Sequence, residues 1–409
     1  MIKFLKVIFV LVLSSNSESF FNNFQPRKKN YSINSGISNF HKSDFNDHEY
    51  QYASEYYNYL IKYDKIEHKI LPLKISNSNS NSAIEIAKSR EKNYRIFEKN
   101  FIKINKINKK NTLNLKINKF TDQIDFDEEQ SDLMTKTVDK NKIIDYDLRA
   151  LKQVLQNPIY YSNKFQNIST SISWNPYLSP VKDQGSCGSC WAFSTTGALE
   201  GVMRFNNYSV ERLSEQELVD CSTENYGCGG GLMHLAFDYI ISNKGISSNL
   251  KYPYTARDGD CRCLDFSEKN CNSESCDCDN ESCDCNSNEN LVNEQVIGSN
   301  ITDYWFTIPR SISDIMASLK YSPISIALDA SKFEFRFYGS GVIDIPSNES
   351  NTINHAVLLT GYDFDEEGPY WIIQNSWGKD WGDNGYAKIR IRNGDGVLLS
   401  QLYGVYPKY

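Results

Sequence analysis

Hydrophobic positions recur at two different spacings along the chain, and the change between them separates helical from strand segments. Helical spacing predicts helices over residues 83–108, 190–206, 214–221 and 232–243. From residue 324 onward the pattern changes to short apolar runs, which predict strands at 324–328, 357–362, 370–374 and 386–392. Helices followed by strands favour an α+β domain of two lobes with a cleft between them.

The N-terminal residues have the pattern of a secretory signal peptide. Two lysines precede an apolar run from Val7 to Leu13, which is too short to span a bilayer and is followed by small polar residues. We assign residues 1–19 to this signal, with an ordinary N-terminal strand as the alternative. Residues 20–82 are rich in Asn, Ser and Tyr and end in an alternating Ser-Asn run, which predicts a flexible extension without a packed core.

Cysteine usage and charge both divide the chain near residue 170. All 11 cysteines lie after residue 186, as expected for an exported, oxidised domain behind a leader without cysteine. Residues 170–409 hold 17 Lys and Arg against 32 Asp and Glu, whereas the residues before them hold 27 against 19. A basic leader joined to an acidic body indicates mutual attraction rather than nucleic-acid binding. Asn-x-Ser/Thr sequences compatible with glycosylation occur at Asn30, Asn167, Asn207, Asn280, Asn300 and Asn348.

Candidate chemistry is concentrated between Gln184 and Ser194. Cys190 stands at the start of a predicted helix, where unpaired N–H groups and the positive end of the helix dipole favour thiolate over thiol. Gln184, six residues upstream, offers an amide donor to the same point, and a nucleophile beside a neutral donor is the minimal set for acyl transfer. Cys187 and Cys190 also have the spacing of a redox or metal-binding Cys-x-x-Cys pair.

The base that such a nucleophile requires is found by elimination among five histidines. His41, His48 and His68 lie in the leader, and His234 lies among apolar residues of a predicted helix. His355, at the head of a predicted apolar strand, is therefore the expected base. A thiolate on Cys190 would attack the carbonyl, and the His355 imidazolium would protonate the leaving amine.

Three separated motifs resemble the papain family of cysteine proteases. They are Gln184-Gly-Ser-Cys-Gly-Ser-Cys-Trp191, Asn354-His-Ala-Val357 and Gln374-Asn-Ser-Trp-Gly378. The resemblance covers roughly residues 83–409 and implies a two-lobed fold, a helical lobe plus a β-barrel-like lobe, with the active site in the cleft between them. It implies that Asn375 orients His355, that Trp377 shields their contact from water, and that Gln184 binds the oxyanion.

The leader also carries features similar to the inhibitory pro-segments of this family. Phe97, Asn100, Ile104 and Asn108 match an interspersed helical motif, and Asn118-Lys-Phe-Thr-Asp122 resembles a second motif. A generic amphipathic helix is the plain alternative. The resemblance thus implies a pro-segment over residues 83–168 and a peptidase domain over 169–409, with the processing site between about 130 and 168.

Substrate contacts and disulfides follow from the same resemblance. It implies bridges from Cys187 to Cys228 and from Cys221 to Cys261, which leave Cys190 as a free thiol and disfavour the redox or metal alternative. The pocket for the residue two before the cut is expected to be apolar and to involve Tyr403 as well. The implied substrate-binding residues are Gly230, Gly231, Leu232, Met233, Ala327, Ala356 and Trp377.

An insertion over about residues 262–290 departs from the family pattern. It repeats Glu-Ser-Cys-Asp-Cys and holds six cysteines, at 263, 271, 276, 278, 283 and 285, with eight acidic residues against two basic ones. Three further disulfides are the plain interpretation, and a thiolate metal cluster is the alternative. The insertion lacks histidine and would repel a substrate's carboxylate, so we expect an endopeptidase rather than an exopeptidase.

The combined expectation is a cysteine endopeptidase made as an inactive precursor, without a cofactor or a catalytic metal. Its partners would be protein or peptide substrates, its own pro-segment and cystatin-like inhibitors, with no nucleic acid and no stable membrane span. A monomer in the secretory pathway, in a lysosome or acidic vacuole or outside the cell, is expected. A binding or scaffold protein on the same fold is the alternative, and loss of Cys190 or His355 would have indicated it.

Overall fold

In a computed structural model, the chain divides into two compact units. One unit comprises residues 1–110 and 117–124, and the other comprises 111–116 and 125–409. The described residues are part of 52–65, then 80–109, 113–123, 140–157, 160, 163–165, 169–262, 277–279, 282–284, 301–345, 353–401 and 403–409. The predicted signal peptide lies outside them.

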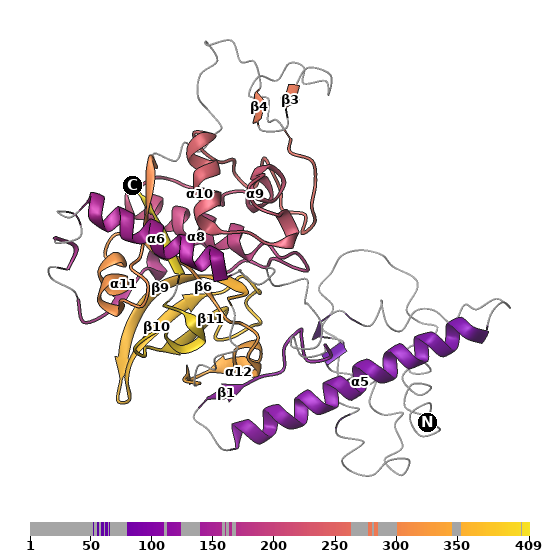
Figure 1. The fold of residues 1–409 in the computed structure, drawn as a ribbon. Coiled ribbons are helices and arrows are strands. Elements are labelled where there is room, and N and C mark those ends of the chain that lie inside the picture. Colours follow the sequence, from indigo (N-terminus) through magenta and orange to yellow (C-terminus); the bar gives the residue numbers. More distant parts are fainter. Residues whose placement is uncertain are drawn as a thin grey trace. The chain divides into compact units, whose positions relative to one another are not determined.

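The first unit is built on the long helix α5 (Ser80–Asn108), shown in indigo in Figure 1. Its Phe97 and Phe101 form a buried apolar cluster with Tyr56, Tyr59 and Leu60. The prediction of an extension without a packed core is therefore wrong for this part of residues 20–82. The missed signal is the spacing of the tyrosines: 52, 56, 59 and 63 share one face of a helix.

The second pro-segment motif folds onto the same cluster. Asn100 Nδ2 donates to the carbonyl of Thr121 at 3.1 Å. Tyr59 Oη donates to Asp122 Oδ1 at 2.6 Å, and Lys65 forms an ion pair with the same buried carboxylate. The carboxylate of the second motif is thus paired with a base of its own leader.

The second unit contains a mainly antiparallel sheet with strand order β5-β12-β6-β9-β10-β11-β8. The central pair β6 and β9 joins Ala327 to Ala356 and Leu328 to His355. Short β2 (Ile172–Ser173) also pairs with β9. Besides β2, the strands of this sheet are β5 (Asp303–Phe306), β6 (Ile324–Leu328), β8 (Val342–Ile343), β9 (His355–Asp365), β10 (Gly368–Gln374), β11 (Tyr386–Arg390) and β12 (Tyr403–Lys408).

Helices α8, α9 and α10 group on one side of this sheet (Figure 1). Helix α8 (Cys190–Phe205) is almost wholly buried. Helix α9 (Glu215–Cys221) begins at Ser214, whose side chain accepts from Glu217 N as a capping box does. The remaining helical elements are α10 (Met233–Ser242), α11 (Ile312–Ser318), α12 (Phe333–Arg336), η2 (Asn175–Tyr177), η3 (Gly227–Gly229) and η4 (Val397–Leu399).

Two leader segments belong to this unit. Strand β1 (Asn114–Leu115) pairs with β7 (Tyr338–Ser340), and Lys116 N donates to the Phe337 carbonyl at 2.8 Å. Helix α6 (Lys140–Gln156) crosses the helical side of the sheet (Figure 1). No helix was expected over these residues. Its Tyr146 and Ala150 join a buried apolar cluster with residues far along the chain, such as Met233 and Tyr403.

The cysteine-rich insertion is described only at its repeat. Strands β3 (Asp277–Asp279) and β4 (Ser282–Asp284) pair antiparallel, with Cys278 opposite Cys283. The rest of residues 263–290 lies outside the described chain, so the three expected disulfides remain a prediction.

Candidate active site

Cys190 is the first residue of α8, and its side chain is completely buried. Cys190 therefore stands at the positive, N-terminal end of the helix dipole, and the N-cap residue Ser189 makes no side-chain hydrogen bond to this helix. That field stabilises a thiolate. The sulfur also accepts from the backbone N–H of Ala356, at 3.4 Å between N and Sγ. This contact brings the thiol to the residue that follows His355.

Two serine side chains hold α8 against the sheet. Ser194 Oγ donates to the Val357 carbonyl in β9 at 2.7 Å, and Ser325 Oγ in β6 donates to the Ser194 carbonyl at 2.9 Å. Both groups are buried, where a hydrogen bond is costly to leave unmade. The first turn of α8 is thereby fixed beside the start of β9.

Asn375 determines which nitrogen of His355 is the basic one. His355 Nε2 lies 2.8 Å from Asn375 Oδ1, and the same oxygen accepts from Ser376 N at 2.8 Å. An oxygen that accepts from a backbone N–H is an acceptor for the ring as well, so Nε2 carries the proton. Nδ1 then holds the lone pair, and it has no hydrogen-bond partner among the described residues. This is the arrangement that a general base requires.

Burial lowers the pKa of His355 to about 4, although the hydrogen bond to Asn375 acts in the opposite direction. Desolvation disfavours the charged imidazolium. Trp377 contributes to this burial, since its ring lies 4.7 Å from the imidazole, centre to centre, at an angle of 33°. Phe335 and Trp381 pack against the edges of Trp377 in turn. The His355–Asn375 contact is therefore covered by aromatic rings.

Gln184 is fully buried, and both the nitrogen and the oxygen of its side-chain amide are hydrogen-bonded. Nε2 donates to the Cys187 carbonyl at 2.9 Å, and Oε1 accepts from Ser376 Oγ at 2.7 Å. An amide nitrogen has two N–H donors, and the bond to Cys187 engages one of them. Ser376 follows Asn375, so one short segment orients both Gln184 and His355.

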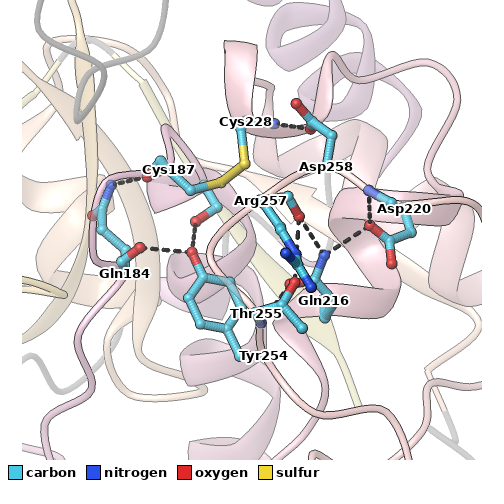
Figure 2. Close-up of a disulfide and its surroundings, with 12 residues drawn as sticks. Gln184, Cys187, Gln216, Asp220, Cys228, Tyr254, Thr255, Arg257 and Asp258 are labelled. Carbon is cyan, nitrogen blue, oxygen red and sulfur yellow. Dashed lines mark hydrogen bonds between the residues drawn. A yellow bond between two sulfur atoms is a disulfide. The ribbon is translucent and has the colours of Figure 1, made fainter.

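Tyr254 is a positioning residue that the sequence analysis did not identify. Its hydroxyl donates to the Gln184 carbonyl at 2.7 Å and contacts Ser189 Oγ at 2.6 Å (Figure 2). It thus links the Gln184 loop to the residue that precedes the nucleophile. The structure forms disulfides between Cys187 and Cys228 and between Cys221 and Cys261. Figure 2 shows the first of these beside Tyr254, in the loop that carries Gln184.

The expected substrate pocket is assembled from three neighbouring strands and the start of α10. Ala327 lies opposite Ala356 on one side and opposite Tyr403 on the other. Met233 belongs to the same buried apolar cluster. Tyr403 Oη lies 2.7 Å from His234 Nδ1. The Tyr403 hydroxyl and the His234 ring, at this end of the cluster, are therefore satisfied by each other.

Gly230, Gly231 and Leu232 form the approach to α10. Gly230 has a φ of +115°, which side chains rarely adopt. A Cβ on Gly231 would lie only 2.5 Å from Asn225 Oδ1 and 2.7 Å from Trp191 Cδ2. Only glycine fits this close approach. Leu232 is the N-cap of α10 in extended conformation, and its N–H donates to Asn225 Oδ1 at 2.7 Å.

Tyr146 of α6 lies against the pocket residues. Its ring is 4.3 Å from that of Tyr403, and its hydroxyl donates to the Gly404 carbonyl and accepts from the Gly404 N–H, both at 2.8 Å. Tyr146 and Ala150 share one buried apolar cluster with Met233, Ala327 and Ala356. Tyr146, Ala150 and Gln153 follow one another at steps of four and three residues, so they share one face of a helix. This spacing was the signal that the sequence offered for the buried face of α6.

The described residues contain neither a candidate metal site nor a helix that could span a membrane. In the ranges given above, no group of three or more His, Cys, Asp and Glu side chains is placed to hold a metal ion. Within the same ranges, every helix is too short or too polar to cross a bilayer.

Comparison with known proteins agrees with this geometry. The sequence profile of the family described as papain family cysteine protease matches residues 168–403. The KDEL-tailed cysteine endopeptidase CEP2 of Arabidopsis thaliana is 33% identical over 305 residues, which cover 73% of this chain and 74% of that protein. Cathepsin L1 of Drosophila melanogaster is 36% identical over 312 residues, which cover 73% and 74%.

Solved precursor structures have the same fold. Digestive procathepsin L 3 of Tenebrio molitor superposes with a TM-score of 0.63 at 26% identity, covering 89% of this chain and 100% of that one. A recombinant stem bromelain precursor gives 0.62 at 26% identity, covering 88% and 99%. The chain therefore belongs to the papain family of cysteine proteases, as the precursor of an endopeptidase that is activated by removal of its pro-segment.

Proposed function

We propose that Cys190, His355 and Asn375 carry out the peptide hydrolysis. The observation that carries this assignment is the tautomer of His355: Asn375 fixes the proton on Nε2 and leaves Nδ1 as the base. The helix dipole stabilises the Cys190 thiolate once Nδ1 has taken its proton. The thiolate attacks the scissile carbonyl, and the imidazolium then protonates the leaving amine. Water, activated by the neutral imidazole, hydrolyses the thioester and regenerates the thiol.

Gln184 and the backbone N–H of Cys190 are the proposed donors to the oxyanion of the tetrahedral intermediate. Such donors act only when they are held in place before the reaction. The contacts of Gln184 with Cys187 and Ser376, together with the clamp of Tyr254 on the Gln184 carbonyl, provide that rigidity. An inactive scaffold would have no need for it, which disfavours the binding-protein alternative.

In the precursor, α6 is proposed to be the part of the pro-segment that blocks the pocket. Tyr146 contacts Tyr403 and shares a buried cluster with Met233, Ala327 and Ala356, so a substrate side chain cannot occupy the same space. Strand β1 anchors the leader by its pairing with β7. Lys116, which follows β1, donates from Nζ to the Gly382 carbonyl at 2.5 Å. Substrate binding therefore requires that α6 leaves.

The mature enzyme is expected to prefer an aliphatic residue two positions before the cut. Its pocket would be lined by Leu232, Met233, Ala327, Ala356 and Tyr403, none of which is charged. Burial of each substrate methylene contributes about 0.8 kcal/mol, and the Tyr403–His234 contact closes the far end against large rings. A fluorogenic peptide library measures this preference. We expect Leu or Val to exceed Phe, and selection of Arg or Glu would contradict the assignment.

The insertion is proposed to be disulfide-bonded. If its six cysteines pair with one another, the denatured but unreduced mature protein contains a single reactive thiol, Cys190. Thiol titration of wild type and of Cys190→Ala should therefore give one and zero thiols per chain. Several free thiols together with bound zinc or copper would favour the metal cluster instead.

The remaining assignments concern the cellular setting. A signal over residues 1–19, the disulfides and the relatives among cathepsins and KDEL-tailed endopeptidases support passage through the secretory pathway. We place the mature enzyme in a lysosome or acidic vacuole or outside the cell, as a glycosylated monomer that is open to cystatin-like inhibitors.

A further inference from the structure

A short segment after α6 packs against β5 and β12 of the peptidase domain. The ring of Tyr160 stacks on Trp305 at 4.2 Å between centres and 7° between planes. Its hydroxyl lies 2.8 Å from that of Tyr406 in β12. Tyr160 precedes the region that matches the family profile, which begins at residue 168.

Lys164 of the same segment forms a completely buried ion pair. Its Nζ lies 2.9 Å from Asp314 Oδ1, and both side chains have 0% exposure. The other carboxylate oxygen accepts from Ile308 N at 2.8 Å, and Lys320 Nζ donates to the Lys164 carbonyl at 3.1 Å. Asp314 lies in the first turn of α11, so the pair joins the segment to the core of the domain.

Loss of Lys164 would leave the carboxylate of Asp314 without a counter-charge inside the protein. Breaking a buried pair by removing one partner is strongly destabilising, because the remaining charge has lost both water and its partner. A cut that removed Lys164 with the pro-segment would therefore damage the mature domain. A boundary at residue 168, which the family resemblance implies, would remove Lys164 in this way.

Helix α6 shows the opposite relation to the mature domain. Its buried Tyr146 covers the residues that substrate must reach, so α6 has to leave on activation. The C-terminal end of α6 is accessible, since Leu155 is 73% exposed and Gln156 is exposed. A pocket that prefers an aliphatic residue two positions before the cut would accept Leu155 and direct cleavage to the Gln156–Asn157 bond.

We propose that the maturation cut falls between Leu155 and Tyr160, and that Tyr160 and Lys164 remain in the mature enzyme as its N-terminal anchor. This moves the boundary of the pro-segment upstream from residue 168. The proposal rests on the function proposed above for the departure of α6 and for the choice of bond. The anchor itself follows from the buried pair, whichever protease makes the cut.

The N-terminus of the mature enzyme tests the proposal directly. Full-length precursor is matured at acid pH, and a second sample is matured by added protease, so that the terminus can be measured even if Cys190 is not the group that cuts. Intact mass and N-terminal sequencing should place the first residue at 156–160, with Asn157 expected from the pocket. A final N-terminus outside this range overturns the proposal.

Thermal unfolding of the mature enzyme gives an independent test. Lys164→Met is compared with Lys152→Met, a matched change at an exposed lysine of α6. If Lys164 is retained, mature Lys164→Met should unfold about 5–15 °C below wild type, while mature Lys152→Met is the same polypeptide as wild type and unfolds with it. Should Lys164→Met precursor fail to fold, Tyr160→Phe serves instead, with a smaller decrease in Tm. Equal Tm values for wild type and the segment variant would show that the segment had been removed.

Discussion

Replacement of Cys190 by Ala is expected to abolish peptide hydrolysis, lowering kcat by at least about 10⁴-fold, because no other group can form the covalent intermediate. His355→Ala should have an effect of the same order, since the thiol then lacks its base. Asn375→Ala should retain partial activity, about 10- to 100-fold below wild type, because it removes only the orientation of the imidazole. Rates on a fluorogenic peptide with an aliphatic residue two before the cut provide the measurement.

The variants must be compared as folded proteins of equal purity. The Cys190 side chain is small, and Ala192 in the same helix turn is already an alanine, so Cys190→Ala should keep the unfolding transition of wild type. Each variant precursor is processed by added protease, so that failure to mature is not mistaken for failure to catalyse. Wild-type turnover by mature Cys190→Ala or His355→Ala would contradict the assignment of both residues.

Acidification is expected to release the precursor's inhibition, with maturation at about pH 4–5 and little at pH 7. Burial lowers the pKa of His355 from 6.5 to about 4 in the closed precursor. Between these pH values, the unfolded chain binds a proton that the folded precursor excludes, so the folded precursor loses stability as pH falls from about 6.5 to about 4. A shift of this size corresponds to about 3 kcal/mol at its full extent. Acid therefore destabilises the folded precursor as a whole.

Charge acts in the same direction. The leader before residue 170 is basic and the remaining chain acidic, and protonation of carboxylates weakens their attraction. Asp122 would also lose its ion pair with Lys65. Added salt screens the attraction between leader and body, so maturation should be faster at higher ionic strength.

The test incubates purified precursor over a grid of pH and salt and follows the conversion by gel and by intact mass. Cys190→Ala precursor is the control for contaminating protease. Equal maturation rates at pH 7 and pH 4.5, or conversion of the Cys190→Ala chain alone, would count against this mechanism.

The candidate site of this protein could be predicted from the sequence because it depends on residue types at few positions. Five histidines left one candidate base, and Asn375 indeed hydrogen-bonds it. The strand predicted at 324–328 has those same bounds in the structure. The helix predicted from residue 190 begins there, with Cys190 as its first residue. These features arise from local periodicity, helix termini and motif spacing, all of which are encoded within a few neighbouring residues.

Other features were decided only by the tertiary structure. Strand β12 lies between β5 and β6, although about 75 residues separate it from β6, and strand pairing over such distances leaves no local pattern. Tyr146 acquires its role from Tyr403, and Lys164 from Asp314, through contacts that span more than 100 residues. The tyrosines near residue 59 form a core only because α5 supplies Phe97. A side chain's environment depends on which distant segment covers it, and only the folded chain brings those segments together.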